Sequence, residues 1–170
     1  MKRITLRGIL RELKRLMRKA GDPYTRLSPK IRHNRGRWQQ STQEAEFQFH
    51  KEDQWRPSPD FMAQTSRLFA YFGFSPDAYK GKTIIDLGAG SKLRTKYFRG
   101  ARIIAIEPLA ERFMKEIEWC NLCDAERVYS APAEERIEEC ISTADLVISI
   151  NVLDHCYDFE RIVENITAYL

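Results

Sequence analysis

The sequence predicts an α/β fold: a partial parallel sheet of about four strands with flanking helices, preceded by an N-terminal helical segment. Three observations lead to this prediction. Runs rich in β-branched and other apolar residues follow one another from position 83 onward, segments with helical patterns separate them, and polar residues or glycines follow each run. Strands that alternate with helices favour right-handed βαβ units and therefore a parallel sheet.

Charge is unevenly distributed along the 170 residues. Residues 1–37 hold 13 of the 28 Lys and Arg residues but only Glu12 and Asp22 as acids, a net charge of +11. Residues 38–170 carry the other 15 basic and 22 acidic residues, a net charge of −7. We therefore expect a basic arm attached to an acidic domain, with separate roles.

Hydrophobicity and cysteine content favour a cytoplasmic protein. No apolar run approaches the roughly 20 residues that span a bilayer. The N-terminus also lacks the apolar core of a signal peptide. The four cysteines are expected to be reduced thiols. Cys120 and Cys123 form a CxxC motif with no second pair at zinc-ligand spacing, so no metal site is expected.

Residues 1–37 predict a basic amphipathic helix followed by a linker. Apolar residues recur at helical spacing from Ile4 to Met17, with lysines and arginines on the other side. Two roles stay open for this helix. It binds an anionic membrane surface or nucleic acid, or it packs its apolar stripe on the following domain. Residues 22–37 are polar and basic, with little regular structure expected.

Residues 38–80 predict an aromatic helical lid or cap segment. Aromatic side chains are dense in its first half, which indicates packing against the domain. His50 and Trp55 either share in this packing or contact a substrate. Ser58-Pro59-Asp60 is a typical helix start with the Ser58 hydroxyl as cap, and the helix that follows should end at Gly73.

The central stretch TIIDLGAG, residues 83–90, predicts a strand and a glycine-rich turn. Its β-branched start is typical of a strand buried on both faces. Asp86 stands where that strand should end, and Gly88 and Gly90 carry no Cβ, so the backbone can approach a ligand closely. A strand that ends in an acid and a glycine-rich turn is the usual entrance to a nucleotide-type cofactor site.

Further strands and helices are expected after this turn. The strands are predicted at 102–106, 127–130 and 145–152, and the helices at 109–119, 134–140 and 159–170. In an open α/β sheet, ligands bind beyond the carboxyl ends of the strands, where the strand order reverses. Glu107, about twenty residues after the first strand, is able to accept hydrogen bonds from both hydroxyls of a ribose. The candidate binding residues at the four strand ends are Asp86, Gly88, Gly90, Glu107, Ala133, Glu134 and Asn151.

These motifs resemble those of class I S-adenosylmethionine-dependent methyltransferases, over residues 82–170. IIDLGAG is similar to the first motif of the family, and IIAIEP to its second-strand acid. APAEE resembles the adenine-contacting turn, and DLVISINVLDHCYD resembles the fourth strand and the loop after it. Within the family, the sequence is most similar to small-molecule enzymes of the ubiquinone/menaquinone-methyltransferase group.

The resemblance implies a Rossmann-like domain over residues 81–170 that binds S-adenosylmethionine. Family members continue with three further strands, so we expect this chain to be truncated after the fourth strand. Lys92 departs from the family pattern, in which a third glycine often stands at this place. The resemblance implies that Asp86, Gly88 and Gly90 hold the methionine part of the cofactor. It assigns the ribose to Glu107 and the adenine to Ala133 and Glu134. Asn151 would lie at the edge of the fourth strand.

The predicted activity is transfer of a methyl group to a small-molecule or lipid-linked acceptor. His155, with Asp154 beside it, is a candidate general base, because the pKa of imidazole lies near neutrality; the alternative is that it packs or caps its loop. A non-catalytic module that binds nucleic acid or membrane through residues 1–37, or an RNA methyltransferase, are the other interpretations. A nicotinamide-dependent dehydrogenase is disfavoured, because Lys92 and Leu93 stand where its fingerprint needs a third glycine.

Overall fold

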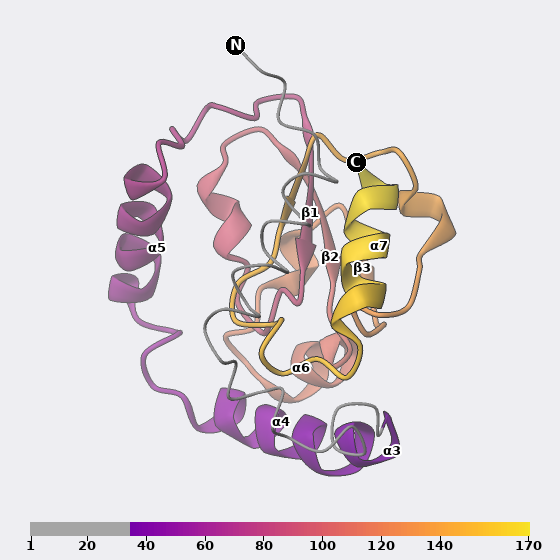
Figure 1. The fold of residues 1–170 in the computed structure, drawn as a ribbon. Helices are drawn as coiled ribbons and strands as arrows, with labels where there is room; N and C mark the ends of the chain where they lie inside the picture. Colours follow the sequence, from indigo (N-terminus) through magenta and orange to yellow (C-terminus); the bar gives the residue numbers. More distant parts are fainter. Residues whose placement is uncertain (1–34) are drawn as a thin grey trace, which may run out of the picture. The chain divides into compact units, whose positions relative to one another are not determined.

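The computed structural model describes residues 35–170 (Figure 1). The predicted basic amphipathic helix and most of the predicted linker therefore lie outside the described residues. The last three residues of that linker form a helical turn, α3 (Arg35–Arg37). In the described part of the chain, no helix is both long enough and apolar enough to cross a membrane.

A parallel sheet of four strands forms the centre of the fold, as predicted. Its strands are β1 (Thr83–Leu87), β2 (Arg102–Ile106), β3 (Arg127–Tyr129) and β4 (Leu146–Ile148). Their order is β3-β2-β1-β4, and every neighbouring pair is parallel. The chain moves outward from β1 to β3 and returns to β4 on the other side of β1, so the strand order reverses between β1 and β4. This topology confirms the prediction of a Rossmann-like α/β fold.

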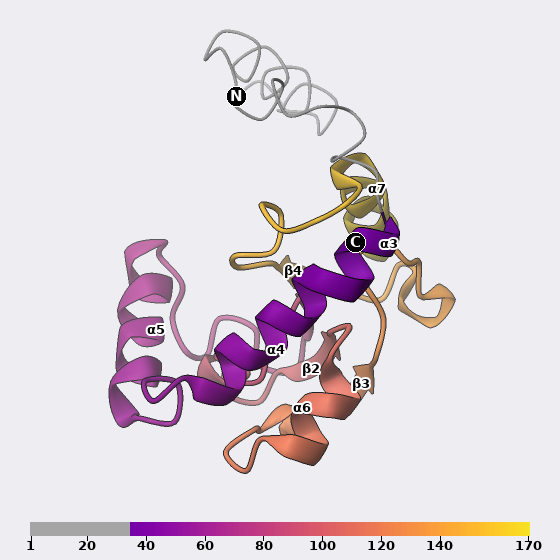
Figure 2. The same cartoon turned by 90° about the horizontal axis from the view of Figure 1, so that it is seen from below.

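Helices cover both faces of the sheet and one of its ends. α5 and α7 lie on opposite sides of the strands (Figure 1). α4 instead crosses the carboxyl-terminal end of the sheet (Figure 2). The longer helices are α4 (Gln43–Glu52), α5 (Pro59–Tyr71), α6 (Ala110–Glu116) and α7 (Phe159–Tyr169), and the short helical turns are η2 (Trp38–Thr42), η3 (Arg94–Tyr97), η4 (Leu122–Asp124) and η5 (Glu138–Cys140).

Three apolar clusters attach these helices to the sheet. Successive side chains of a strand point to opposite faces, so Ile85 of β1 packs in the cluster that includes α7, whereas Ile84 packs in the cluster that includes α5. α4 joins a third cluster through Phe47, whose ring stacks on that of Phe113 in α6 with 6.0 Å between centroids. Every residue of β1 is buried, as its β-branched run predicts.

The predicted helix over residues 134–140 is wrong, because only the short turn η5 forms there. Backbone groups in this stretch and directly before it bond to side chains of α7 instead. The amide nitrogen of Asn165 donates to the carbonyl of Ala133 (3.0 Å), and the hydroxyl of Tyr169 accepts from the backbone N–H of Ile137 (3.0 Å). A helix this short is unstable without tertiary support, so the contacts with α7 decide the local backbone.

The predicted strand over residues 145–152 is shorter than expected. Its last ladder pair joins Ile148 to Asp86, because β1 ends one residue later and the chain then turns at Gly88. Residues 149–152 therefore leave the sheet, and Asn151 adopts a left-handed backbone with φ of 56°. The apolar run correctly indicated a strand, but only residues 146–148 have a neighbouring strand to pair with.

Other element boundaries lie close to the predicted ones. β3 ends at Tyr129, and α6 ends at Glu116, before its expected end. α5 begins at Pro59, and Gly73 follows it with φ of 82°, as predicted. The Ser58 hydroxyl does not cap this helix; it is buried without a hydrogen-bond partner. The sequence therefore predicted where α5 begins, but the predicted capping hydrogen bond of the Ser58 hydroxyl is wrong.

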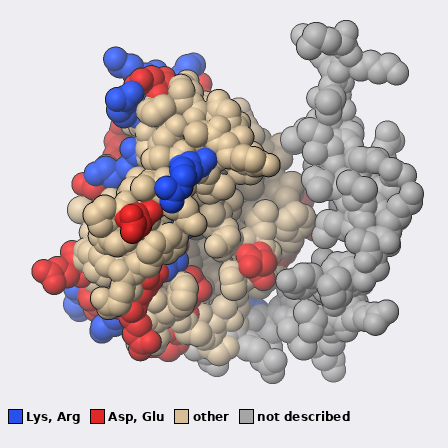
Figure 3. Space-filling model, turned by 90° about the vertical axis from the view of Figure 1, so that its left-hand side faces the viewer, with Lys and Arg blue, Asp and Glu red and all other residues tan. Residues whose placement is uncertain are grey.

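The surface over α5 has few charged side chains near its centre (Figure 3). Tyr71 and Phe72, at the end of this helix, are 84% and 65% exposed, whereas Phe69 is buried against the sheet. Single exposed aromatic side chains are common on folded proteins. Tyr71 consequently serves as a surface reference for tyrosine substitutions in the core.

We predict that Tyr169→Phe destabilises the fold by about 1–3 kcal/mol, the cost of leaving the buried N–H of Ile137 without an acceptor. Tyr71→Phe, an exposed change of the same kind, should leave the free energy of unfolding unchanged. Urea denaturation followed by circular dichroism measures both. Equal stability of the two variants would show that the Tyr169 hydroxyl does not support the 134–140 segment.

Candidate functional site

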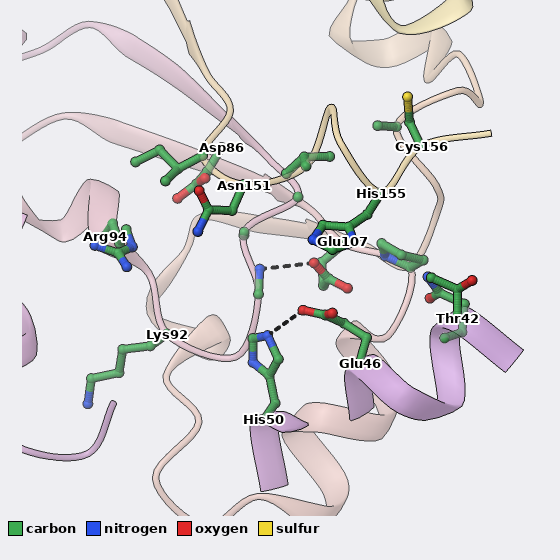
Figure 4. A pocket seen from close by; sticks show the side chains of 18 of the residues that line it. Thr42, Glu46, His50, Asp86, Lys92, Arg94, Glu107, Asn151, His155 and Cys156 are labelled. Carbon is green, nitrogen blue, oxygen red and sulfur yellow. Dashed lines mark hydrogen bonds and ion pairs between the residues drawn. The ribbon is translucent and has the colours of Figure 1, made fainter. Parts of the chain in front are cut away.

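A pocket lies at the carboxyl-terminal end of the sheet, beside the point where the strand order reverses (Figure 4). Strand ends and the loops after them form one wall, and η2 and α4 form the opposite wall. Of the two predicted catalytic residues, His155 lines the pocket and Asp154 does not. All of the residues predicted to bind a cofactor line it, namely Asp86, Gly88, Gly90, Glu107, Ala133, Glu134 and Asn151.

The glycine turn after β1 is enclosed by protein on two sides. Gly88 and Gly90 both have left-handed backbones, with φ of 74° and 64°. A Cβ on Gly88 would overlap the methyl groups of Val152, and one on Gly90 would come within 2.9 Å of Cε1 of His50. The bare backbone predicted for approach to a ligand is thus also required by the loop after β4 and by α4.

Glu107, directly after β2, holds the glycine turn in place. Its Oε2 accepts from the backbone N–H of Gly90 (2.9 Å), and its Oε1 accepts from that of Leu109 (3.0 Å). Burial raises the pKa of Glu107 to about 7 against these two bonds, and the charges of Glu46 and Asp86 raise it further. The pocket therefore contains a carboxyl group that exchanges its proton near neutral pH.

Asp86, in β1, is a second buried carboxyl group at the pocket. Its Oδ2 accepts from the hydroxyl of Thr95 (2.6 Å) in η3. Burial raises the pKa of Asp86 to about 6, although the bonds from Thr95 and the charge of Arg94 oppose this shift. Asp86 therefore connects β1 with the turn that follows the glycines.

Glu134 organises the far side of the pocket. Its Oε1 accepts from the backbone N–H groups of Tyr157 (2.8 Å) and Asp158 (3.3 Å), which lie just before α7. Burial raises the pKa of Glu134. No helix begins at Glu134, because the first helical turn after it starts at Glu138. Its carboxylate instead joins the loop after β3 to the loop after β4.

His155 lies in the pocket-lining loop after β4, with Asp154 beside it. The distance from Nε2 of His155 to Oδ2 of Asp154 is 3.3 Å, and both side chains are 55% exposed. The indole N–H of Trp38 donates to the carbonyl of His155 (2.8 Å), which ties η2 to this loop. His155 and Asp154 thus form an imidazole–carboxylate pair that solvent can reach. In such a pair, the carboxylate can orient the imidazole as a base.

One face of η2 and α4 contributes a stripe of lining residues. Trp38, Thr42, Glu46 and His50 recur every four residues and all line the pocket, because side chains at this spacing share one helix face. Apart from His50, sequence analysis did not connect the polar members of the stripe with the site. The helical spacing of these residues indicates that they share one face of a helix. The sequence around them does not indicate that this face meets the glycine turn.

His50 is buried between the stripe and the glycine turn. Its Nδ1 lies 2.6 Å from the hydroxyl of Ser91 and accepts from the backbone N–H of Ser91 (3.3 Å). Nε2 then carries the proton and donates to Glu46 (3.0 Å). The ring also stacks on Phe113 at 4.6 Å. His50 is therefore a packed residue that orients its neighbours. Trp55 does not line the pocket, and it packs edge-on against Phe61, which does.

Side chains typical of metal ligands do not converge in the described part of the chain. No group of three or more His, Cys, Asp or Glu side chains within residues 35–170 is arranged to hold an ion. Cys120 and Cys123 are free thiols, and burial raises the pKa of Cys120, which keeps it protonated.

Comparison with known proteins adds no assignment. No protein-family model matches the chain, and no curated protein matches it.

We predict that Gly88→Ala destabilises the protein by more than Gly81→Ala. Both glycines have left-handed backbones, which cost an alanine roughly 1–2 kcal/mol. Only the Cβ at position 88 meets a neighbour, Val152, whereas a Cβ at Gly81 has nothing within 4 Å. The difference between the two free energies of unfolding isolates the contact between the turn and the β4 loop. A difference of zero would contradict that contact.

The raised pKa of Glu107 predicts a pH-dependent stability. Between about pH 4.5 and 7 the unfolded chain loses the Glu107 proton while the folded chain keeps it, so the free energy of unfolding falls by about 3 kcal/mol as pH rises through this window. Glu107→Gln should remove this part of the slope. Urea titrations at several pH values measure it.

The quantity to compare between wild type and variant is the slope of the free energy of unfolding against pH. The absolute free energies will differ, because Gln can accept only one of the two backbone bonds, so the variant is less stable already at low pH. Acids that do not interact with Glu107 contribute equally to both proteins. Identical slopes in wild type and variant would show that Glu107 titrates normally.

Proposed function

We propose that this chain is an S-adenosylmethionine-dependent methyltransferase that acts on a small-molecule or lipid-linked acceptor. The observation that carries the proposal is the convergence of Asp86, Glu107 and Glu134, buried carboxyl groups from three strand ends, on one pocket at the crossover of the sheet. Open α/β sheets bind their ligands at this place.

The chemistry of these groups fits the cofactor. Each carboxylate oxygen of Glu107 accepts one backbone bond and retains capacity for another, which suits the two hydroxyls of a ribose. The cofactor carries a positive sulfonium and a positive ammonium, and Coulomb attraction favours both beside Asp86, Glu46 and Glu107. The pocket is therefore better suited to a cation than to a phosphate at its centre.

A dinucleotide fits this pocket less well, because its pyrophosphate is negatively charged. Dinucleotide-binding turns present the N-terminus of an α-helix to the pyrophosphate. Here the glycine turn is followed by η3, a single short turn of helix, and Leu93 is buried in the apolar cluster with Phe47. A pyrophosphate would lack the helix dipole and would lie close to the carboxylates of Glu46 and Glu107.

The bound cofactor would supply an activated methyl group. Methyl transfer needs alignment of donor and acceptor and exclusion of water. η2 and α4 cover the strand ends, and the bond from Trp38 to the carbonyl of His155 keeps this cover attached to the β4 loop. We assign to His155, oriented by Asp154, the role of accepting a proton from acceptors that must lose one.

Isothermal titration calorimetry of the full chain tests the cofactor class directly. We expect saturable binding of S-adenosylmethionine and S-adenosylhomocysteine, and no binding of NAD. Binding of NAD without either adenosyl compound would overturn the proposal. Binding of none of the three would favour a non-catalytic module, whose basic arm, residues 1–37, lies largely outside the described residues.

We predict that Glu107→Ala weakens binding of S-adenosylmethionine by about 1–3 kcal/mol, the scale of lost hydrogen bonds to a charged group. Glu111→Ala is the matched control, because Glu111 is an exposed carboxylate on α6 that does not line the pocket. Calorimetry on both folded variants gives the two affinities. Unchanged affinity of Glu107→Ala would remove Glu107 from the site.

A further inference from the structure

The pocket contains a half-buried arginine whose charge has no carboxylate partner in the described part of the chain. Arg94, at the start of η3, lines the pocket but forms no ion pair within residues 35–170. The arginines that do form ion pairs are Arg35, Arg56, Arg99 and Arg112. Others without one are exposed to water, namely Arg67, Arg102, Arg127, Arg136 and Arg161.

The contacts that hold Arg94 leave its charge uncompensated. Its guanidinium carbon lies 4.3 Å above the ring of Phe61, and one of its nitrogens donates to the hydroxyl of Thr65 (3.1 Å). An aromatic face and a neutral hydroxyl fix the orientation of a guanidinium without neutralising it. Asp86 attracts Arg94 through space, although no ion pair joins these two side chains. Further N–H donors of Arg94 remain available, since the guanidinium has five.

Two other basic residues gather at the same end of the pocket. Arg56 also lies over Phe61, at 6.0 Å, but its charge is balanced by an ion pair with Asp53. Lys92, the residue that replaces the expected third glycine, lines the pocket and forms no ion pair within residues 35–170. Figure 4 shows Lys92 and Arg94 on one side of the pocket, with the carboxylates of Glu46 and Glu107 between them and the opposite end.

We propose that Lys92 and Arg94 form a binding seat for an oxyanion, a carboxylate or phosphate group of the ligand, at the Phe61 end of the pocket. Two sources share this chemistry: the amino-acid carboxylate of the cofactor, which rests on the proposed function, and an anionic group on the methyl acceptor. Arginine binds such groups through paired N–H donors, and lysine adds a point charge. Such a seat also gives a role to Lys92, which forms no ion pair with the carboxylates of the pocket.

Nuclear magnetic resonance on the ¹⁵N-labelled full chain, titrated with inorganic phosphate, tests the seat. We expect saturable shifts of the Arg94 Nε–H signal and of the backbone N–H of Gly90. Residue-resolved signals are needed because residues 1–37, with a net charge of +11, also attract phosphate. Arg94→Met should weaken phosphate binding, read at Gly90, by about 10- to 100-fold, the range for charge-assisted hydrogen bonds.

Lys96→Gln is the matched control: Lys96 is an exposed cation of the same turn, paired with Asp124 outside the pocket, and its loss should leave phosphate binding unchanged. Lys92→Gln, a milder change than Arg94→Met, should weaken phosphate binding by several-fold and decides the question if Arg94→Met fails to fold. Absence of saturable shifts in the wild type, or equal affinity in Lys92→Gln and Lys96→Gln, overturns the seat.

Competition distinguishes the two sources. If S-adenosylhomocysteine displaces phosphate while adenosine, which has no carboxylate, does not, the seat holds the cofactor carboxylate. If phosphate binds equally with S-adenosylhomocysteine present and bound, the seat serves the acceptor. If S-adenosylhomocysteine does not bind but phosphate binds through Arg94, the proposed methyltransferase function fails and the oxyanion seat stands.

Discussion

The contact of the glycine turn with its protein neighbours is the constraint on which the rest of the site depends. Val152 and His50 occupy the space that Cβ atoms at Gly88 and Gly90 would need, so the β4 loop and α4 can reach their places only beside a bare backbone. Glu107 then fixes the turn through the backbone N–H of Gly90. One short turn thereby sets the position of the β2 acid, the helical cover and the loop that carries His155.

Burial of carboxyl groups is the energetic cost of this arrangement. Asp86 and Glu107 have pKa values raised to about 6 and about 7 because the pocket removes them from water, so their ionised forms destabilise the folded state near neutral pH. Raised carboxyl pKa values of this kind are typical of functional sites, although structural networks produce them too. A positively charged ligand would relieve this cost and stabilise the fold by binding it selectively.

α4 has two tasks. It packs into the core through Phe47, and the ion pair of Glu44 with Arg112 (2.5 Å) connects the same helix to α6. Exposed ion pairs contribute little, typically 0–1 kcal/mol, so the stacked contact of Phe47 with Phe113 is the main attachment. The helix also brings Glu46 and His50 to the glycine turn, and the ring of His50 stacks on Phe113 as well. The stability of the fold and the closure of the pocket therefore depend on the same helix.

Local patterns in the sequence determined the fold class, the places of the four strands along the chain and seven of the residues that line the pocket at the strand ends. This was possible because β-branched runs, glycines and acids that follow strands are short-range signals. Only the tertiary structure decided that α7 keeps residues 134–140 from forming a helix, that β4 stops at Ile148, and that His50 meets Ser91, 41 positions away. Each of these outcomes depends on a partner distant in sequence, and a local pattern does not specify which partner a backbone or side chain will find.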